Sequence, residues 1–384
     1  MKIAVVVNSR ANYGRIKSFL ENARKFKTLD IKVIAGASAL LAKYGRVIDI
    51  IKKDGFEVAA ELDSIVEGDD PIHMAKSTGL GIIETSTALK NLSPDAVLTI
   101  ADRYETLATA VAASYMNIPV IHTQGGDQTG SIDESVRHAI TKLSHIHFPA
   151  SKESEKRIIS LGENPEFVFN VGCPSIDLIK NTNLSYKEGM FKNAKGIGGT
   201  IDFFKPYIVV LMHPVTTKIK ETSESINELL KAVIKIRNKN IQVVWLWPNI
   251  DAGGEMVSKA IRTSRETSEL KNVHLYKNFP PEDYLVLINN CKCLVGNSSS
   301  GLREGSFLGV PVVNIGTRQQ HRESASNVKN VDYISESIFE AVIYQVNHGK
   351  YSSSKHLGDG EAGLNMCKIL STINLPSSQK KLYY

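Results

Sequence analysis

Short apolar runs alternate with amphipathic stretches along almost the whole chain, and this alternation is the feature that most limits the possible folds. The runs have the length of strands, and the stretches between them have the spacing of helices. Strands separated by helical segments form βαβ units and parallel sheets. The candidate strands are Ile3–Val7, Ile31–Ala35, Ala96–Ile100, Val120–Thr123, His145–Pro149 and Phe167–Val171, followed by Tyr207–Met212, Gln242–Leu246, Val273–Tyr276, Cys293–Val295 and Pro311–Ile315.

A polar stretch from Asn181 to Thr200 divides these candidate strands into two series. Two series predict an α/β fold of two doubly wound, Rossmann-like domains, and a ligand site in the cleft between them. We expect the first domain to span residues 1–175 and the second to span residues 200–358. The remaining residues, 359–384, contain one further periodic segment, Ala362–Ile373, which is expected to pack back on the first domain.

Composition limits the classes of function. The chain has 384 residues and is 42% hydrophobic, which is enough for two cores. It contains no apolar run of 18 residues, so we expect no membrane association, and its first apolar run is too short for a signal peptide. The four cysteines are scattered without the second pair of a zinc site, which favours a reducing cytoplasm. A net charge of +6 does not argue for nucleic acid, but it suits an anionic substrate.

The stretch from His122 to Leu143 carries the densest set of polar residues. It follows an apolar run, turns at Gly125-Gly126, and continues into a helical pattern in which Val136 and Ile140 recur on one face. Ligands of open α/β sheets bind at the carboxyl ends of strands. The site candidates that this places there are Asp127, Asp133, Glu134, Arg137 and His138.

Glu134 has a second interpretation. Ser131-Ile132-Asp133-Glu134 fits a capping box, in which Ser131 is the N-cap and Glu134 bonds back from the N3 position. Spacing alone leaves capping and catalysis both open.

Two further loops of the first half end predicted strands. The loop from Asn8 to Gly14 lacks the GxGxxG fingerprint of dinucleotide binding, but its Arg10 can bind a phosphate; the alternative is a surface arginine. Asp102 can cap a helix or act as a general acid or base.

Two loops of the second half suggest an anion site. His213 follows an apolar strand and can donate to a phosphate, although a single histidine is more often structural. The run from Gly296 to Gly305 offers small residues, hydroxyls and free backbone N–H groups where a strand meets a helix. Glu304, one turn into that helix, can bind ribose hydroxyls. The alternative is an ordinary serine-capped helix.

Together these motifs resemble the hydrolysing UDP-N-acetylglucosamine 2-epimerases of sialic acid and legionaminic acid synthesis. The similarity extends over almost the whole chain. It is carried by Arg10-Ala11-Asn12-Tyr13, Asp102-Arg103, Gly130 to His138, Gly172-Cys173-Pro174-Ser175, His213-Pro214-Val215-Thr216-Thr217, Pro248 to Gly253, Gly296-Asn297-Ser298-Ser299, Arg303-Glu304 and Gly316-Thr317-Arg318-Gln319.

The resemblance implies a GT-B type fold and a reaction without a cofactor or metal. The C2 proton and UDP leave by anti elimination, which gives a 2-acetamidoglucal. Water then adds at C1, and a proton returns to C2 from the opposite face, so two acid/base groups are needed. We expect the closed cleft to raise the pKa of a catalytic carboxyl by desolvation. The partners implied are a UDP-sugar and further copies of the chain, in a homodimer or homotetramer.

The resemblance also assigns roles to individual residues. Asp102 and Glu134 become acid/base candidates, with Asp133, Asp127 and His213 as further catalytic candidates. Arg10, His213, Ser298 and Ser299 would hold the diphosphate, and Glu304 the ribose. Other parts of the ligand would contact Arg103, Gln124, Arg137, Asn249 and Arg318.

The chain departs from the family pattern at three places. Gln124 replaces the glutamate of the usual His-x-Glu-Gly-Gly-Glu run, the run from Gly36 to Leu40 replaces Gly-x-His-Leu, and Ile100-Ala101 precede Asp102 in place of His or Leu and Gly. These changes border the sugar, so a 2,4-diacetamido-2,4,6-trideoxy sugar on UDP or GDP is an alternative substrate. A GT-B glycosyltransferase and a non-catalytic nucleotide-sugar binding protein are the competing functions.

Overall fold

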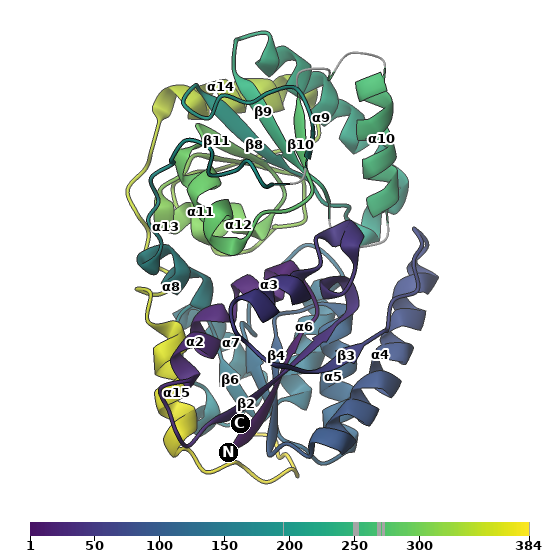
Figure 1. Cartoon of the computed structure of the whole chain (residues 1–384), viewed down its shortest axis with the longest axis vertical. Coiled ribbons are helices and arrows are strands. Elements are labelled where there is room, and N and C mark those ends of the chain that lie inside the picture. The colour runs from purple at the N-terminus through teal and green to yellow at the C-terminus, as the bar shows by residue number, and fades with distance from the viewer. Residues whose placement is uncertain (195, 249–252, 267–269, 271–272, 384) are drawn as a thin grey trace.

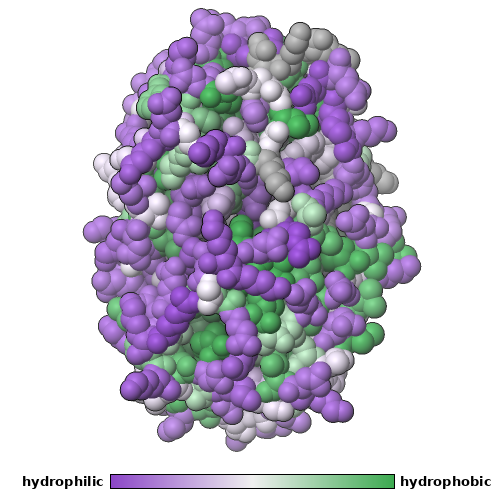
Figure 2. All heavy atoms as spheres, in the orientation of Figure 1, coloured by the Kyte–Doolittle hydropathy of each residue, from purple (hydrophilic) through white to green (hydrophobic). Residues whose placement is uncertain are grey.

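The chain folds into two lobes, one above the other in Figure 1, each built on its own sheet. This computed structural model describes residues 1–194, 196–248, 253–266, 270 and 273–383. The lower lobe contains the N-terminal half of the chain, and the upper lobe contains the C-terminal half. Hydrophilic side chains cover most of the visible face, whereas apolar atoms gather over the lower lobe (Figure 2). In the described residues, no helix has the length and apolarity that a membrane span requires.

The sheet of the lower lobe has six parallel strands in the order β3-β2-β1-β4-β5-β6. Its strands are β1 (Lys2–Val7), β2 (Asp30–Gly36), β3 (Val58–Leu62), β4 (Ala96–Ile100), β5 (Val120–Thr123) and β6 (Ile146–Phe148). Alternate residues of β1 enter the two apolar clusters on opposite faces of this sheet, which is why the strand is apolar throughout.

The helices of the lower lobe cover both faces of this sheet. They are α1 (Arg10–Gly14), α2 (Lys17–Ala23), α3 (Val47–Lys53), α4 (Pro71–Leu92), α5 (Tyr104–Tyr115), α6 (Asp133–Leu143), α7 (Lys152–Ser160) and α15 (Ala362–Thr372), with 3₁₀ turns η1 (Ala37–Ala39), η2 (Ala42–Tyr44) and η3 (Pro165–Phe167). The helix α8 (Pro174–Asn181) lies at the boundary of the lobes, and its apolar residues join a core cluster of the upper lobe. The start of α4 follows from its sequence, because Asp70 accepts the N–H of Ile72 and Pro71 occupies the first turn.

The sheet of the upper lobe has seven strands in the order β13-β12-β11-β8-β9-β10-β7, and only the edge strand β7 runs antiparallel. Its strands are β7 (Gly196–Gly198), β8 (Tyr207–Leu211), β9 (Gln242–Leu246), β10 (His274–Tyr276), β11 (Cys293–Gly296), β12 (Val312–Ile315) and β13 (Val328–Val331). The remaining elements are η4 (Thr216–Glu221), α9 (Thr222–Arg237), α10 (Gly254–Glu266), α11 (Pro281–Asn290), α12 (Ser299–Leu302), α13 (Glu304–Leu308) and α14 (Ser335–His348).

The two parallel, helix-covered sheets confirm the α/β fold of two doubly wound domains. The last helix, α15, returns to the lower lobe and lies against α2, where Met366, Cys367 and Leu370 are buried in the core around β1. The domain limits at residues 175, 200 and 358 stay predictions.

Ten of the eleven candidate strands correspond to strands of the two sheets. The exception is Phe167–Val171, for which the strand prediction is wrong: Val168 makes a single bridge to His147, and the chain leaves the sheet at Gly172, where φ is +86°. The sequence analysis missed β3, β7 and β13. All three are sheet edges whose residues are mostly exposed or half-buried, so they lack the fully buried apolar run that marks a central strand.

Strand order reverses once in each sheet, between β1 and β4 in the lower lobe and between β8 and β11 in the upper lobe. Ligands of doubly wound sheets bind at such reversals. The loops that follow β4, β8 and β11 contain Asp102, His213 and Ser298, and the short loop after β1 leads into α1, which begins at Arg10. The fold therefore directs four separate sequence motifs toward one region.

Candidate active site

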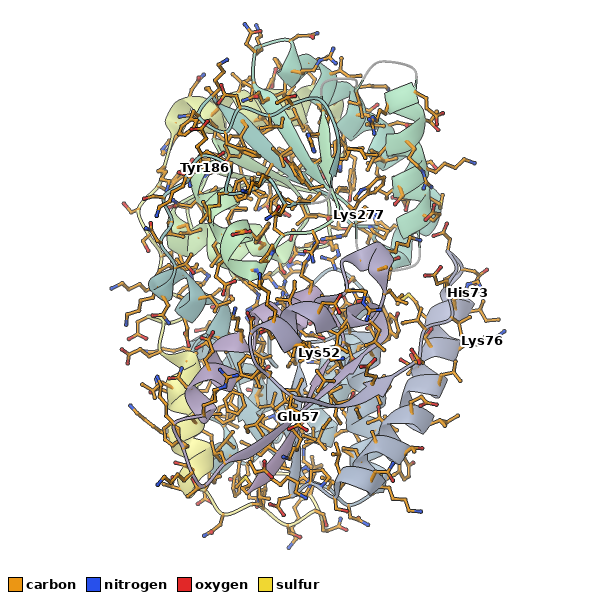
Figure 3. The ribbon with its side chains drawn as sticks, in the orientation of Figure 1. Lys52, Glu57, His73, Lys76, Tyr186 and Lys277 are labelled. Atoms are coloured by element: carbon orange, nitrogen blue, oxygen red, sulfur yellow. The ribbon has the colours of Figure 1, made fainter. Side chains whose placement is uncertain are left out.

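A cleft of about 400 Å³ lies between the lobes at these strand ends. Residues of both halves line this cleft. Arg10 Nη1 donates a 3.4 Å hydrogen bond to the carbonyl oxygen of Lys277, which lies at the boundary of the lobes in Figure 3. The candidates that line the cleft are Arg10, Asp102, Arg103, Asp133, His213, Ser298, Ser299, Glu304 and Arg318. The sequence motifs thus converge on one cavity.

His213 lies in a strongly cationic part of the cleft. Its backbone N–H donates to Asn297 Oδ1 at 2.8 Å, and Asn297 donates back to its carbonyl oxygen, which fixes the end of β8 against the end of β11. Burial lowers the pKa of His213 well below its usual value, and Arg318, Arg10 and Arg103 lower it further. A neutral histidine among three arginines has the chemistry of an anion site.

The serine turn faces the same region. Ser298 caps α12 by accepting the N–H of Ser300, and the Ser299 hydroxyl accepts a 2.8 Å hydrogen bond from Arg15. Arg15 comes from the lower lobe, so this contact joins the two halves. Glu304 also lines the cleft, and its Oε2 atom is buried with no hydrogen-bond partner among the described residues. A buried, unpaired acceptor suits a ligand hydroxyl.

Asp102 is held by arginines. Arg137 donates to its Oδ2 atom through Nη2 at 2.5 Å and Nε at 3.1 Å, and Arg322 Nη2 lies 3.7 Å away. Burial raises the pKa of Asp102, but Arg137, Arg322 and Arg15 outweigh burial, so the pKa lies well below the usual range of a carboxyl. The side chain of Arg137 is fully buried and does not line the cleft. Arg137 therefore orients Asp102 from behind.

Asp127 forms ion pairs between the lobes. Its Oδ2 atom accepts a hydrogen bond from Arg303 at 2.7 Å and lies 3.0 Å from Arg322 Nε. Burial raises the pKa of Asp127, while Arg322, Arg303 and Arg137 lower it, and the net shift is downward. Asp127 does not line the cleft, because both upper-lobe arginines lie against it.

Glu134 also lies outside the cleft lining, and it does not form the capping box that was one of its two interpretations. The N-cap of α6 is Ile132, and Glu134 accepts the N–H of Thr129 at 2.7 Å and hydrogen bonds from Arg137 and His138 at 2.8 and 3.0 Å. The Glu134 carboxylate thus accepts a hydrogen bond from the loop before α6 and not from the backbone of Ser131. The Ser131 hydroxyl donates to the Asp133 carboxylate. Partial burial raises the pKa of Glu134, but Arg137 outweighs it and the net shift is downward.

The expectation of a raised carboxyl pKa is wrong for Asp102, Asp127 and Glu134 in this state. Desolvation acts in the expected direction on each of them, but the neighbouring guanidinium groups have the larger combined effect. These three carboxylates are therefore ionised near neutral pH before any ligand binds.

Two other candidates need separate mention. Gln124 is buried, does not line the cleft, and has φ of +61°; neither amide heavy atom has a hydrogen-bond partner among the described residues. Asn249 lies outside the described residues.

Sequence analysis missed Arg15 and Arg322 of this region, and it named Arg303 in a family motif without giving it a role. Arg15 is five residues beyond Arg10, and Arg322 is four residues beyond Arg318 in the loop after β12. A search for basic residues four or five positions beyond each selected arginine would have found both. The burial of Arg303 against Cys173 and Asp127 depends on packing between lobes, and no local pattern marks it.

Two doubly wound lobes with an arginine-rich and carboxylate-bearing cleft at their switch points define a GT-B type protein with a site for an anionic ligand. The family profile described as UDP-N-acetylglucosamine 2-epimerase matches residues 21–371. The chain belongs to this family.

The relatives agree with this membership. The chain is 32% identical to UDP-N,N'-diacetylbacillosamine 2-epimerase (hydrolyzing) of Legionella pneumophila, over 98% of this chain and 97% of that one. It is 26% identical to UDP-N-acetylglucosamine 2-epimerase of Neisseria meningitidis serogroup B, over 98% and 96%. The fold is similar to the crystal structure of UDP-GlcNAc 2-epimerase of Methanocaldococcus jannaschii in complex with UDP-GlcNAc and UDP, with a TM-score of 0.80, 16% identity, and 97% and 99% coverage.

Proposed function

We propose that the chain is a hydrolysing 2-epimerase that converts UDP-N-acetylglucosamine to N-acetylmannosamine and UDP. The observation that carries this proposal is one cleft in which Asp102 and Asp133 of the lower lobe share the lining with the cationic cluster around His213. The lower lobe supplies carboxylates for proton transfer, and the arginines around His213, which come from both lobes, supply positive charge for a diphosphate leaving group.

The reaction has two steps. In the first, a base takes the C2 proton, the electron pair forms the C1–C2 double bond, and the C1–oxygen bond breaks so that UDP leaves. In the second, water adds its hydroxyl to C1 and gives its remaining proton to a carboxylate, while an acid gives a proton to the opposite face of C2. The free 2-epimeric sugar is released.

Asp102 is the proposed base of the first step. It is ionised, it lines the cleft, and Arg137 fixes its orientation. We assign the second acid/base group to Asp133, which lines the cleft, in preference to Glu134, which does not. Glu134 then holds Arg137 and the loop at Thr129, and Arg137 acts through Asp102.

The nucleotide is assigned to the upper lobe. His213, Arg318 and the Ser298–Ser299 turn of the upper lobe would hold the diphosphate together with Arg10 of the lower lobe, and Arg103, also of the lower lobe, lies beside them. The buried Oε2 atom of Glu304 would accept ribose hydroxyls. The lobes enclose the ligand, which would exclude water until elimination is complete.

A second candidate is the same reaction on a UDP-linked 2,4-diacetamido-2,4,6-trideoxy sugar. Two observations favour it: the 32% identity to the Legionella enzyme, and the small Ser38, which lines the cleft in the run where the family often has a histidine. A smaller side chain leaves more room for a substituent on the sugar.

Products formed in deuterated water test the proposal. Purified enzyme is incubated with UDP-N-acetylglucosamine, with the UDP-linked diacetamido sugar, or with its GDP analogue, and products are followed by mass spectrometry. We expect free UDP and a 2-epimeric free sugar that carries one deuterium at C2. An epimerised sugar still attached to UDP would contradict hydrolysis. Absence of turnover without an added acceptor would favour a glycosyltransferase, and UDP binding without turnover would favour a binding protein.

A further inference from the structure

The loop after β12, residues 316–323, makes several contacts between the lobes next to the cleft, and we call it the clamp loop. Its Arg318 carbonyl accepts the N–H of Gly130 at 3.2 Å, and its Glu323 accepts the hydroxyl of Ser151 at 2.5 Å. Gly130 and Ser151 belong to the lower lobe. One loop of the upper lobe is thus hydrogen-bonded to two points on the other side of the cleft.

Gly130 allows the clamp loop to come this close. A Cβ atom at residue 130 would lie 1.9 Å from the carbonyl oxygen of Thr317, far inside van der Waals contact. The obstructing atom is backbone, which cannot rotate away as a side chain can. Any residue other than glycine at this position would hold the clamp loop away from the lower lobe.

Arg322 is the clamp-loop residue that reaches the carboxylates. Its Nε atom lies 3.0 Å from Asp127 Oδ2, although the N–H does not point along that direction, so the contact is an ion pair without a hydrogen bond. Its Nη2 atom lies 3.7 Å from Asp102 Oδ2, and Nη1 donates to Gln319 at 2.7 Å. Arg322 lines the cleft, while Arg303, its neighbour on Asp127, does not.

We propose, on the basis of the function proposed above, that Arg322 is a positioning residue: closure of the lobes brings it beside Asp102 and fixes that carboxylate for proton transfer. Arg137 belongs to the same lobe as Asp102 and holds it whether the lobes are open or closed. Arg322 belongs to the opposite lobe and reaches Asp102 only through the docked clamp loop. The other end of that loop carries Arg318, beside His213, so one loop connects the nucleotide region with the proposed base.

The charges around Asp102 indicate what removal of Arg322 changes. Arg137 of α6, Arg15 behind α1 and Arg322 of the clamp loop all lower the pKa of Asp102, against the effect of burial. Burial and the neighbouring arginines in turn lower the pKa of Arg322 to about 10. Loss of the Arg322 charge therefore raises the pKa of Asp102, and a base with a higher pKa loses its ionised form at a higher pH.

The first experiment compares Arg322→Met and Arg322→Lys in the full-length enzyme. We expect Arg322→Met to lower kcat by roughly 10²-fold, the usual effect of a misplaced catalytic group, with a smaller change in UDP affinity. The acidic limb of its kcat profile moves to higher pH, and Arg322→Lys partly restores both values. Arg24→Met is the matched control, because Arg24 donates two hydrogen bonds far from the cleft lining. An Arg322→Met enzyme with wild-type kcat and pH profile would overturn the proposal.

The second experiment blocks docking without removing a charge. Gly130→Ala is compared with Gly79→Ala, where a Cβ meets nothing within 4 Å. We expect Gly130→Ala to lower kcat by a similar factor and to leave the UDP-bound protein larger than wild type in X-ray scattering. A Gly130→Ala enzyme with wild-type turnover and wild-type compaction contradicts the proposal.

The two proposals fail in different ways. If wild-type enzyme releases no UDP from any of the sugar nucleotides, the proposed function fails and the scattering arm still tests docking of the clamp loop. If wild type turns over but the Arg322 and Gly130 variants match it, the positioning role alone fails.

Discussion

The two sheets end their strands at the cleft in different ways. In the lower lobe, left-handed φ values follow β2, β4 and β5 at Ala37 (+51°), Ala101 (+65°) and Gln124 (+61°). In the upper lobe, the positive φ values directly at the ends of β11 and β12 belong to glycines, Gly296 (+133°) and Gly316 (+72°), although His321, further along the loop after β12, is also left-handed (+65°). Equivalent turns therefore cost backbone strain in the lower lobe, where a residue with a Cβ atom disfavours this conformation by about 1–2 kcal/mol.

This difference matches what each lobe supplies. Gly296 is required by close packing, since a Cβ there would lie 2.1 Å from the carbonyl oxygen of Leu211. Ala101 directly precedes Asp102. The Nε2 atom of His122 is hydrogen-bonded to the carbonyl oxygen of Ala101 at 2.8 Å. Strained residues persist where the surroundings fix them, often beside chemistry. Under the proposed function, strain in the lower lobe would aim the carboxylate of Asp102, whereas glycine in the upper lobe permits close packing of backbone against Leu211.

The largest expected effect is the loss of the lower-lobe carboxylates. Asp102→Asn and Asp133→Asn should each lower kcat by about 10²–10⁴-fold with nearly unchanged UDP affinity, because a general acid/base group is removed. Glu134→Gln should lower kcat less than tenfold. Steady-state rates of UDP release and calorimetric titration with UDP measure these changes. Equal losses for Glu134→Gln and Asp102→Asn would return Glu134 to the catalytic set.

The next effect should come from Gly296→Ala in the upper lobe. The positive φ costs about 1–2 kcal/mol and the clash with Leu211 costs typically another 1–3 kcal/mol, so the midpoint of urea unfolding should fall. UDP affinity should fall as well, because the turn that carries Ser298 moves. Gly79→Ala serves as the control, since its Cβ meets no atom. If Gly296→Ala unfolded at the same urea concentration as the wild-type protein, glycine would not be required at this turn, and the contrast between the strand ends of the two lobes would be wrong.

His213→Ala tests the anion site with a smaller effect. We expect UDP binding to weaken by about 1–3 kcal/mol, the usual contribution of a hydrogen bond to a charged group. Unfolding by urea should change little by comparison. Unchanged UDP affinity in calorimetry would exclude contact between His213 and the diphosphate.

The same histidine predicts a proton linkage. Burial, together with Arg318, Arg10 and Arg103, lowers the pKa of His213, so it is neutral at pH 7 in the free protein. A bound diphosphate brings negative charge and raises that pKa, so UDP binding takes up a proton and strengthens as pH falls. Calorimetry in two buffers of different ionisation enthalpy should give different heats, and His213→Ala should abolish the difference. Equal heats with the wild-type protein would contradict this linkage.

The smallest effect should come from Ala101→Gly. Release of left-handed strain stabilises the folded state, whereas the greater conformational freedom of glycine stabilises the unfolded chain. The free energy of unfolding should therefore rise by at most about 1 kcal/mol. We expect a slightly higher unfolding midpoint and a kcat reduced less than tenfold, because Asp102 is aimed less firmly. A clear loss of stability would mean that Ala101 is not strained.

Periodicity predicted the fold because central strands buried on both faces must be apolar. The same reasoning failed at β3, β7 and β13, where exposure at a sheet edge removes the pattern. Cleft residues at strand ends, such as Arg10 and His213, were predictable from their position after apolar runs. The ion pair of Asp127 with Arg303 was not predictable from the sequence, because those residues are 176 positions apart and meet only when the lobes pack.

The position of α15 has a consequence for the order of folding. Met366, Cys367 and Leu370 fill the core around β1, so the first lobe to be synthesised lacks part of its interior until the last residues emerge. The second lobe draws its described core from residues 150–357 and can be completed earlier. Chains released before residue 362 would carry an exposed apolar surface along α2, a target for chaperones and proteases.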